Sequence, residues 1–351
     1  MTPNDAKLEA EFVIGPEAAR ELDSRVDWQY PQAGKNVRNV WVQGDSVFVL
    51  DADNLLCRIL LKGGVRLWRT AVTDPTEEVH AVNFIEEKVY VTTGGSVVVL
   101  DANTGAQTGK QTLDKIANTQ PVVHGQFLIY GSRNGQAIWH SFPVGYMWKG
   151  YQVSPSISIA PVLNGRKLAF VGDDGTVMML DATNATQYWS KKLLSAVKSQ
   201  PALGTDAVYV AGTDQYIWAY DIDDGRTIWR TLTESPLEHS PVLIGEFVYQ
   251  QVPSRGLVCF EALPLDSPGG KVAWTAAGQA GNVVMRRRDQ LLVWDGVGKK
   301  LTILEAKRGG FVKTLDLPKV KFFVVPDPTG DNAEVIAADN DGRVVHMVPR
   351  N

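Results

Sequence analysis

Cysteine is scarce in this sequence, which has only Cys57 and Cys259 among its 351 residues. Both fall in runs of alternating polarity that are predicted as strands of non-neighbouring repeats, so we expect no disulfide between them. Histidine is also rare, and the five side chains show no spacing typical of a zinc site: His80, His124, His140, His239 and His346. A nucleophile elbow, a Walker loop and a dinucleotide-binding glycine motif are missing as well. The residues therefore predict no catalytic group, no metal site and no cofactor, and we do not expect an enzyme.

The sequence also lacks a strong excess of positive or negative residues. The net charge is -4 and the isoelectric point is near 5.8, so no basic surface for nucleic acid is expected. The one basic run, Arg286-Arg287-Arg288, is interpreted as a solvated strand end or loop, with a phosphate contact as the alternative. No apolar run approaches the roughly 18 residues that would predict a transmembrane segment. The first residues lack the order of a signal peptide. The protein is therefore expected in the cytoplasm, or outside it if an export signal has been removed.

A repeat of 40 residues is what the sequence does contain. Pro161, Pro201 and Pro241 follow one another at this spacing before Val-Leu or Ala-Leu, and Pro121 stands one step earlier. The 32 glycines and 18 prolines suit a chain that turns every few residues. A period near 40 that carries short alternating runs is typical of a β-propeller blade, which is one four-stranded sheet.

Two further sets of residues recur in phase with the prolines, and we expect both to be structural. A tryptophan on the outermost strand is predicted to fill the wedge between neighbouring blades, with its indole N–H bonded to a carbonyl: Trp28, Trp68, Trp148, Trp189, Trp229 and Trp274. An acid that ends a run of alternating residues is predicted to accept hydrogen bonds from its own turn, where Gly105 and Gly225 supply a positive φ: Asp101, Asp181, Asp221 and Glu261. Since each blade has one such acid, these carboxylates cannot converge on a calcium ion.

Eight blades can be counted between Val37 and Val348, and the last of them has only three strands. The alternating run from Val26 to Tyr30 can supply the missing strand, which removes the free edge of the ring. The predicted fold is thus an all-β, eight-bladed propeller of four-stranded antiparallel blades, closed by an N-terminal strand in the last blade. We predict a single propeller domain over residues 26–350, a monomer, and an N-terminal extension over residues 1–25 with a short helix near Pro16.

The loops before the repeated prolines are predicted to line one face around the central channel, because the prolines should open the innermost strands. Six polar residues in these loops form a candidate face for a protein partner: Asn118, Gln120, Lys198, Gln200, Glu238 and His239. The alternative is a polar channel that holds ordered water.

Three strand–turn units resemble the repeat of the pyrroloquinoline-quinone-like (PQQ-like) family: Asp101-Ala-Asn-Thr-Gly, Asp221-Ile-Asp-Asp-Gly-Arg-Thr-Ile-Trp229 and Ala338-Asp-Asn-Asp-Gly-Arg-Val. The resemblance covers roughly residues 26–348. It implies one of two functions. The quinoprotein dehydrogenases of this family carry the quinone and Ca²⁺ over the channel, whereas the BamB-like branch has no cofactor and helps to assemble β-barrel proteins in the bacterial outer membrane.

The departures from the enzymes favour the BamB-like branch. Cys57 and Cys259 are not a vicinal pair, and no Asp, Asn and Glu group matches the metal and base positions of the dehydrogenases. The resemblance to BamB implies a scaffold for barrel-assembly proteins in the periplasm of the cell envelope, although no lipobox cysteine stands at the N-terminus. A PQQ-dependent alcohol or sugar dehydrogenase with a degenerate site is the alternative. A carbohydrate-binding propeller is a third, based on Tyr146, Tyr151 and Trp294.

Overall fold

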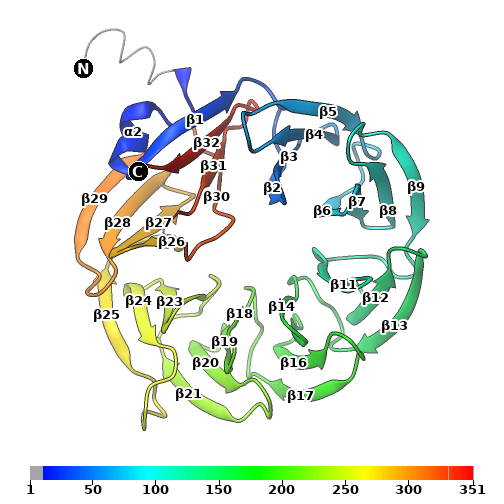
Figure 1. Cartoon of the computed structure of the whole chain (residues 1–351). Coiled ribbons are helices and arrows are strands. Elements are labelled where there is room, and N and C mark those ends of the chain that lie inside the picture. The colour runs from blue at the N-terminus through cyan, green and yellow to red at the C-terminus, as the bar shows by residue number, and fades with distance from the viewer. Residues whose placement is uncertain (1–10, 331, 351) are drawn as a thin grey trace.

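The runs of alternating residues form eight four-stranded antiparallel sheets. These sheets are arranged as a ring in the computed structural model (Figure 1). The structure describes residues 11–330 and 332–350. This confirms the predicted eight-bladed propeller. Each of Pro121, Pro161, Pro201 and Pro241 immediately precedes the innermost strand of its blade, where a missing N–H breaks no hydrogen bond of the sheet.

The first seven blades each use four consecutive strands. Blades one to four are formed by β2 (Asn39–Gln43), β3 (Ser46–Leu50), β4 (Leu55–Leu60) and β5 (Arg66–Ala71); β6 (Val79–Ile85), β7 (Lys88–Thr93), β8 (Ser96–Asp101) and β9 (Gln107–Thr112); β10 (Val122–His124), β11 (Phe127–Gly131), β12 (Gln136–Ser141) and β13 (Tyr146–Gln152); and β14 (Val162–Asn164), β15 (Lys167–Val171), β16 (Thr176–Asp181) and β17 (Gln187–Lys192). Blades five to seven are formed by β18 (Ala202–Leu203), β19 (Ala207–Ala211), β20 (Tyr216–Asp221) and β21 (Thr227–Leu232); β22 (Val242–Ile244), β23 (Phe247–Val252), β24 (Gly256–Glu261) and β25 (Val272–Ala277); and β26 (Asn282–Arg287), β27 (Gln290–Asp295), β28 (Lys300–Glu305) and β29 (Phe311–Asp316).

Blade eight joins the two ends of the chain. It contains β30 (Phe322–Val324), β31 (Val335–Ala338) and β32 (Val344–Pro349), and its outermost strand is β1 (Ser24–Tyr30). In this antiparallel pair Trp28 lies opposite His346. The predicted closure by an N-terminal strand is therefore confirmed.

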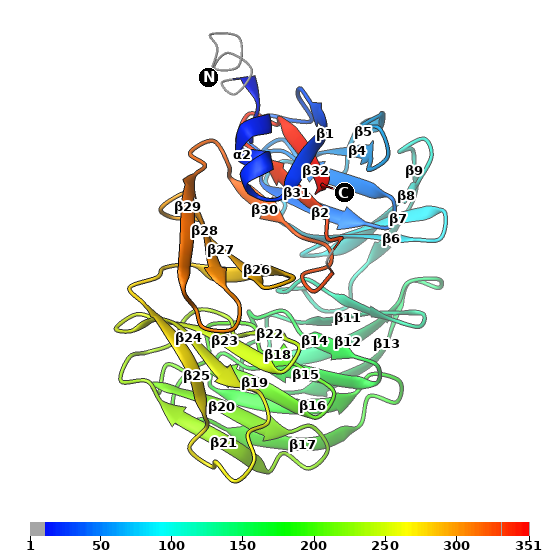
Figure 2. The same cartoon turned by 60° about the vertical axis from the view of Figure 1, so that its left-hand side comes forward.

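A short helix covers this closing blade. The helix α2 (Pro16–Glu21) has proline in its first turn and lies on the outer rim beside β1 and β29 (Figures 1 and 2). Ala19 and Leu22 are buried in one apolar cluster with Ile303 of blade seven and Val345 of blade eight. Residues from before β1 thus belong to the core that holds the last two blades together.

Arg287 contributes to the same junction from blade seven. Its side chain is only 4% exposed, and its guanidinium donates to the carbonyl of Leu22 (2.9 Å), the hydroxyl of Ser24 (2.9 Å) and the carbonyl of Ala333 (2.7 Å). The interpretation of Arg286-Arg287-Arg288 as a solvated strand end is therefore wrong for its middle residue. Strand alternation turns this one side chain inward, where its terminal nitrogens bond to oxygens of the segment before β1, of β1 itself and of the loop before β31.

The apolar core lies between blades rather than at the centre of the ring. In one cluster Tyr209 and Ala219 of blade five pack with Val258 and Phe260 of blade six. Cys57 and Cys259 are also buried, both as free thiols. Each blade is therefore stabilised by burying apolar area against its neighbours, about 25 cal/mol per Å².

The same kind of hydrogen bond closes most of these wedges. Its acceptor is the backbone carbonyl of the residue that follows the third strand of the next blade. In several wedges an indole N–H of the outermost strand donates: Trp28 to Leu61 (2.6 Å), Trp68 to Ala102 (2.6 Å), Trp189 to Ile222 (3.0 Å), Trp229 to Ala262 (2.8 Å) and Trp274 to Ala306 (3.1 Å). The ring thus fills the wedge while its polar edge finds a partner, as expected of a buried tryptophan.

The structure differs from the prediction at Trp148. Lys149, not Trp148, occupies the position in β13 that Trp189 occupies in β17, as shown by the pairs Trp139–Lys149 and Met179–Trp189. A shift of one residue along a strand turns a side chain to the other face. Trp148 is accordingly 40% exposed and stacks on Phe127, with ring centroids 4.9 Å apart.

Two other residues close the wedges after blades two and three, which have no tryptophan at this position of the outermost strand. Trp139, on the third strand of blade three, is fully buried and donates to the carbonyl of Ala182 (2.8 Å). In blade two the side-chain amide of Gln111 donates to the carbonyl of Phe142 (2.7 Å). Both acceptors stand at the same place in their blades as those of the other wedges. The hydrogen bond is therefore kept after blade three, where the tryptophan has moved, and after blade two, where it is missing.

The predicted turn acids are found at their turns, with one difference. Asp101 accepts from the backbone amides of Asn103 and Thr104, and Asp181 and Asp221 make the equivalent contacts in their own turns. Glu261 instead pairs with Lys271 (2.5 Å) because a longer loop follows it.

Candidate partner-binding face

The candidate residues lie on loops that connect one blade to the next. We call their surface the inter-blade loop face; over blades three to six it consists of residues 113–121, 153–161, 193–201 and 233–241. Each of these loops leads from an outermost strand to the proline before the next innermost strand. Because the repeat length is constant here, equivalent side chains recur around the channel.

Four of the six predicted residues link neighbouring blades. The ammonium group of Lys198 lies 2.6 Å from the Glu238 carboxylate of the next loop. The side-chain amide of Asn118 donates to the carbonyl of Ile157 (2.7 Å). Gln200 contacts the loops on both sides of its own. Its backbone N–H donates to the hydroxyl of Ser240 (3.1 Å), and its side-chain amide donates to the carbonyl of Ala160 (3.3 Å). These residues form contacts between neighbours along the face rather than one cluster.

Gln120 and His239 complete the predicted set, and both are exposed. The backbone carbonyl of His239 accepts a hydrogen bond from the buried Gln250 amide (3.0 Å), which fixes the loop on blade six. The imidazole itself stands at the surface beside Glu238. It is therefore available to a partner.

The charges on this face are partly neutralised by one another. Hydrogen bonding and attraction from Lys198 lower the pKa of Glu238, although the carboxylate is solvent-exposed. Asp173, in the turn between β15 and β16, accepts from the hydroxyls of Ser156 and Ser158 in the neighbouring loop, both at 2.6 Å. Such mutually bonded side chains are held in place, which makes the polar surface ordered before any partner arrives.

Apolar side chains that the sequence analysis did not single out project from the same loops. Leu194 is 91% exposed and Ile116 is 51% exposed. Leu193 takes the buried position of the repeat, so Leu194 is an extra leucine where equivalent positions carry Asp114, Ser154 and Glu234. An apolar residue out of phase with the repeat was the signal that could have revealed it.

The aromatic residues considered for sugar binding do not form one platform. Tyr146 is 49% exposed on β13, whereas the Tyr151 hydroxyl donates to Gln187 (2.8 Å). Trp294 lies on β27, four blades away, and stacks on Phe323 at 5.6 Å between ring centroids. A flat sugar-stacking surface is therefore not assembled from these three side chains.

Within residues 11–330 and 332–350, no group of three or more His, Cys, Asp and Glu side chains is arranged to hold a metal ion. The helices in this part of the chain are also too short and too polar to cross a membrane.

Comparison with known proteins points to one family. The family model described as "Outer membrane protein assembly factor BamB" matches residues 18–123 and 123–261. The outer membrane protein assembly factor BamB of Francisella salina is 30% identical over 82 residues, which span 23% of this chain and only 15% of that relative.

Solved structures show the same fold. The crystal structure of BamB from Moraxella catarrhalis has a TM-score of 0.71 at 15% identity and covers 92% of this chain and 97% of that chain. The computationally designed Ika8 protein has a TM-score of 0.70 at 16% identity and covers 90% of this chain and 97% of its own. At such identities the likeness concerns fold alone. The family match extends over more than half of the sequence, and together with the eight-bladed ring it shows that the chain belongs to the PQQ-like propeller family of the outer membrane protein assembly factor BamB.

Proposed function

We propose that this chain is a non-enzymatic scaffold that binds a protein partner through its inter-blade loop face, and that the partner is a component of the β-barrel assembly machinery in the bacterial cell envelope. The observation that carries the proposal is the exposure of Leu194, 91%, on a loop that also holds Lys198. Isolated apolar groups surrounded by ordered polar side chains are the usual composition of a binding hot spot and its rim. Family membership supports the choice of partner.

The test is binding of purified barrel-assembly proteins from the same organism to the wild-type chain and to variants of this face. Leu194→Asp is expected to weaken binding at least tenfold, because it places a charge in the centre of the interface. Lys198→Glu should weaken it less, and the double variant Lys198→Glu with Glu238→Lys should regain part of the loss. Val144→Asp on the opposite face is the matched control, since Val144 is 71% exposed in the turn between β12 and β13.

Two results would contradict the proposal. One is the absence of binding to every barrel-assembly protein of the organism. The other is saturable binding of pyrroloquinoline quinone with Ca²⁺ accompanied by turnover in a dye-linked assay, which would favour the dehydrogenase alternative. Fractionation of cells that express the full-length gene tests the envelope location separately.

A further inference from the structure

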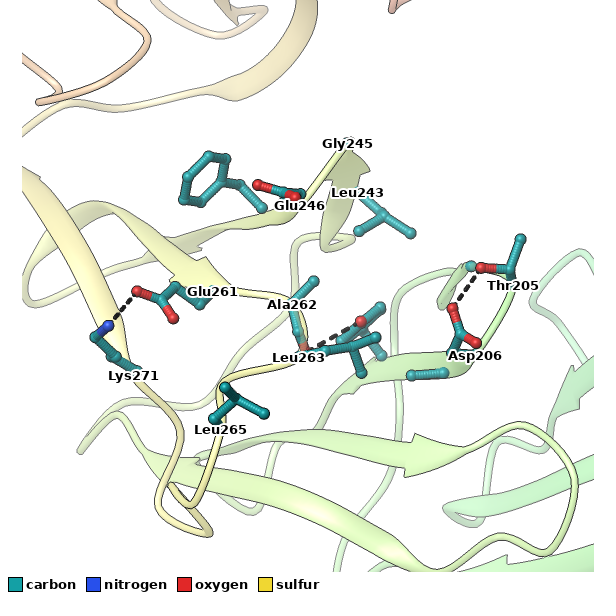
Figure 3. A pocket seen from close by; sticks show the side chains of 14 residues that line it. Thr205, Asp206, Leu243, Gly245, Glu246, Glu261, Ala262, Leu263, Leu265 and Lys271 are labelled. Carbon is teal, nitrogen blue, oxygen red and sulfur yellow. Dashed lines mark hydrogen bonds and ion pairs between the residues drawn. The ribbon is translucent and has the colours of Figure 1, made fainter.

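A hollow of about 660 Å³ lies on the opposite face, between blades five and six. Its walls are the turn between β18 and β19, the turn between β22 and β23, and the loop that joins β24 to β25 (Figure 3). Its volume is in the range of sites that bind ligands or peptide side chains. It is distinct from the inter-blade loop face, since these turns stand at the other ends of the strands.

One wall of the hollow is an extension found in blade six. Residues 262–271 separate β24 from β25, whereas only residues 222–226 separate the corresponding strands of blade five. The extension is fixed on blade five, because the backbone N–H of Arg230 donates to Pro268 (3.1 Å) and the hydroxyl of Thr231 donates to Gly269 (2.6 Å). At its base the carbonyl of Ala262 accepts from the Trp229 indole (2.8 Å). The wall is therefore anchored at both ends.

This anchored wall presents leucines to solvent. Leu265 is 94% exposed and Leu263 is 48% exposed, although both line the hollow. Figure 3 shows Leu263 between the Glu261–Lys271 pair and the Thr205–Asp206 pair. Large apolar side chains held outward by a fixed loop are a feature of docking surfaces, because their exposure has no structural benefit within the isolated chain.

Acidic groups predominate around these leucines. Lys271 is the single cation of the lining, and it is paired with Glu261 at 2.5 Å. Asp206 accepts from the hydroxyl of Thr205 (2.6 Å), and Glu246 is exposed at the tip of the turn between β22 and β23. Two carboxylates thus remain without a cation among the lining residues, so a positively charged side chain is the complementary occupant.

The adjoining hollow has an excess of positive charge, with two guanidinium groups and one carboxylate in its lining. It measures about 500 Å³, shares Gly245 with the first, and is lined on its other side by Arg286, Arg288, Asp289 and Thr329. Asp289 is paired with Lys307 (3.6 Å) and Arg288 with Asp23 (3.5 Å). The turn that carries Gly245 and Glu246 therefore separates an acidic apolar hollow from a basic one. A small cation would use one of the two, whereas an extended chain can lie across both.

We propose that blades five to seven bind an extended peptide segment of a partner protein, in which a Lys or Arg with apolar neighbours enters the hollow beside Glu246 and an acidic residue meets Arg286. The site is independent of the inter-blade loop face. Its recognition depends on the order of the charges in the peptide, because the two hollows lie side by side and have opposite signs.

The proposal is tested by selecting phage-displayed random twelve-residue peptides on the wild-type chain. We expect a consensus of a basic residue with apolar neighbours, followed or preceded at a fixed spacing by an acid. A synthetic consensus peptide, followed by fluorescence polarisation, should bind at least tenfold more weakly to Glu246→Lys and to Leu265→Asp. Arg286→Glu should bind it less well and should prefer a peptide whose acid is replaced by Lys.

Leu194→Asp is the matched control and should bind the peptide like the wild type, even though it is expected to lose the partner of the loop face. Leu265 and Glu246 are exposed, so their variants should keep the wild-type melting temperature. Selection without a consensus, equal binding by Glu246→Lys, or binding of spermidine with no peptide binding would overturn the proposal.

Discussion

Blade three and blade four close the wedge to their next neighbour with tryptophans from different strands. Blade four uses Trp189 of its outermost strand, which is 6% exposed, whereas blade three uses Trp139 of its third strand, which is fully buried. Both indoles donate to the backbone carbonyl of the residue that follows the third strand of the next blade. The fold therefore constrains the position of a ring and a donor in the wedge and leaves open which strand supplies them.

The turn residue that faces the wedge also differs between the two wedges. Gly225 has φ of 71°, and a Cβ there would lie 2.6 Å from Cδ2 of Trp189. The corresponding residue facing blade three is Ala185, with φ of 52°, which packs in one cluster with Trp139. A methyl group fits where the outer-strand tryptophan is missing and does not fit where it is present.

The largest expected effect separates the buried tryptophans from Trp148. Trp189→Ala and Trp139→Ala should each lower the free energy of unfolding by about 3 to 5 kcal/mol, since each removes a large buried ring. Trp148→Ala should cost less than about 1 kcal/mol because this ring lies at the surface. Guanidinium unfolding followed by circular dichroism measures all three. Equal losses for Trp148 and Trp189 would remove the distinction between the blades.

The next effect concerns the glycine. Gly225→Ala should cost about 2 to 3 kcal/mol, because alanine is strained at positive φ and its methyl group overlaps the Trp189 ring. Ala185→Gly, the reverse change in the other turn, should be neutral or stabilising by up to about 1 kcal/mol. Thermal unfolding of the pair gives the comparison, and a stable Gly225→Ala variant would argue against the overlap.

The acid at the turn also differs, since blade four has Asp181 where blade three has Ser141. Burial by itself would raise the pKa of Asp181, but hydrogen bonds outweigh this and lower it from 3.8 to about 2. The donors are the Tyr188 hydroxyl (2.7 Å), two backbone amides of the turn and the Arg166 guanidinium (2.6 Å).

This lowered pKa predicts a pH-dependent contribution of blade four. The folded carboxylate stays charged below the unfolded pKa, so its stabilisation of about 2 kcal/mol is complete above about pH 4 and is lost as the pH falls toward 2. Asp181→Asn should be less stable than the wild type at pH 7, and the two curves should converge near pH 2. Urea unfolding across this range is the measurement; a constant gap between the curves would contradict it. Ser141→Ala in blade three should show no such pH dependence.

The smallest effect isolates the hydrogen bond of the indole. Trp139→Phe keeps most of the ring but leaves the Ala182 carbonyl without this donor, at an expected cost of about 1 kcal/mol beyond the loss of ring area. Trp148→Phe is the control and should change the melting temperature little. If the two variants are equally stable, packing and not the donor determines where the tryptophan stands.

These same residues explain how far the sequence could predict the fold. Constant spacing located the prolines, the turn acids and the closing strand, because these depend on local backbone geometry. It failed at Trp148, where the spacing to Trp189 is 41 residues instead of 40 and strand alternation reverses the side chain. Trp139, Gln111 and Arg287 act through contacts with another blade, and no single repeat contains that information.

The candidate face was predictable in outline only. The prolines placed Lys198, Gln200 and Glu238 on one face, and the repeat length of 40 residues accounts for the contacts between equivalent loops. Leu194 and the extension after Glu261 depart from the repeat. The repeat pattern does not predict such residues. Departures from a repeat are nevertheless where a scaffold can acquire specificity.

The pairing of Ser24 with Pro349 has a consequence for the order of events during synthesis. The strand β1 must wait for its partner β32 until the strands between them have been translated, a separation that makes this contact slow to form. Until then the growing chain is an open arc with two unprotected edges. Completion of the ring is thus a quality check on the propeller, because a product that stops before β32 offers β1 no strand with which to pair.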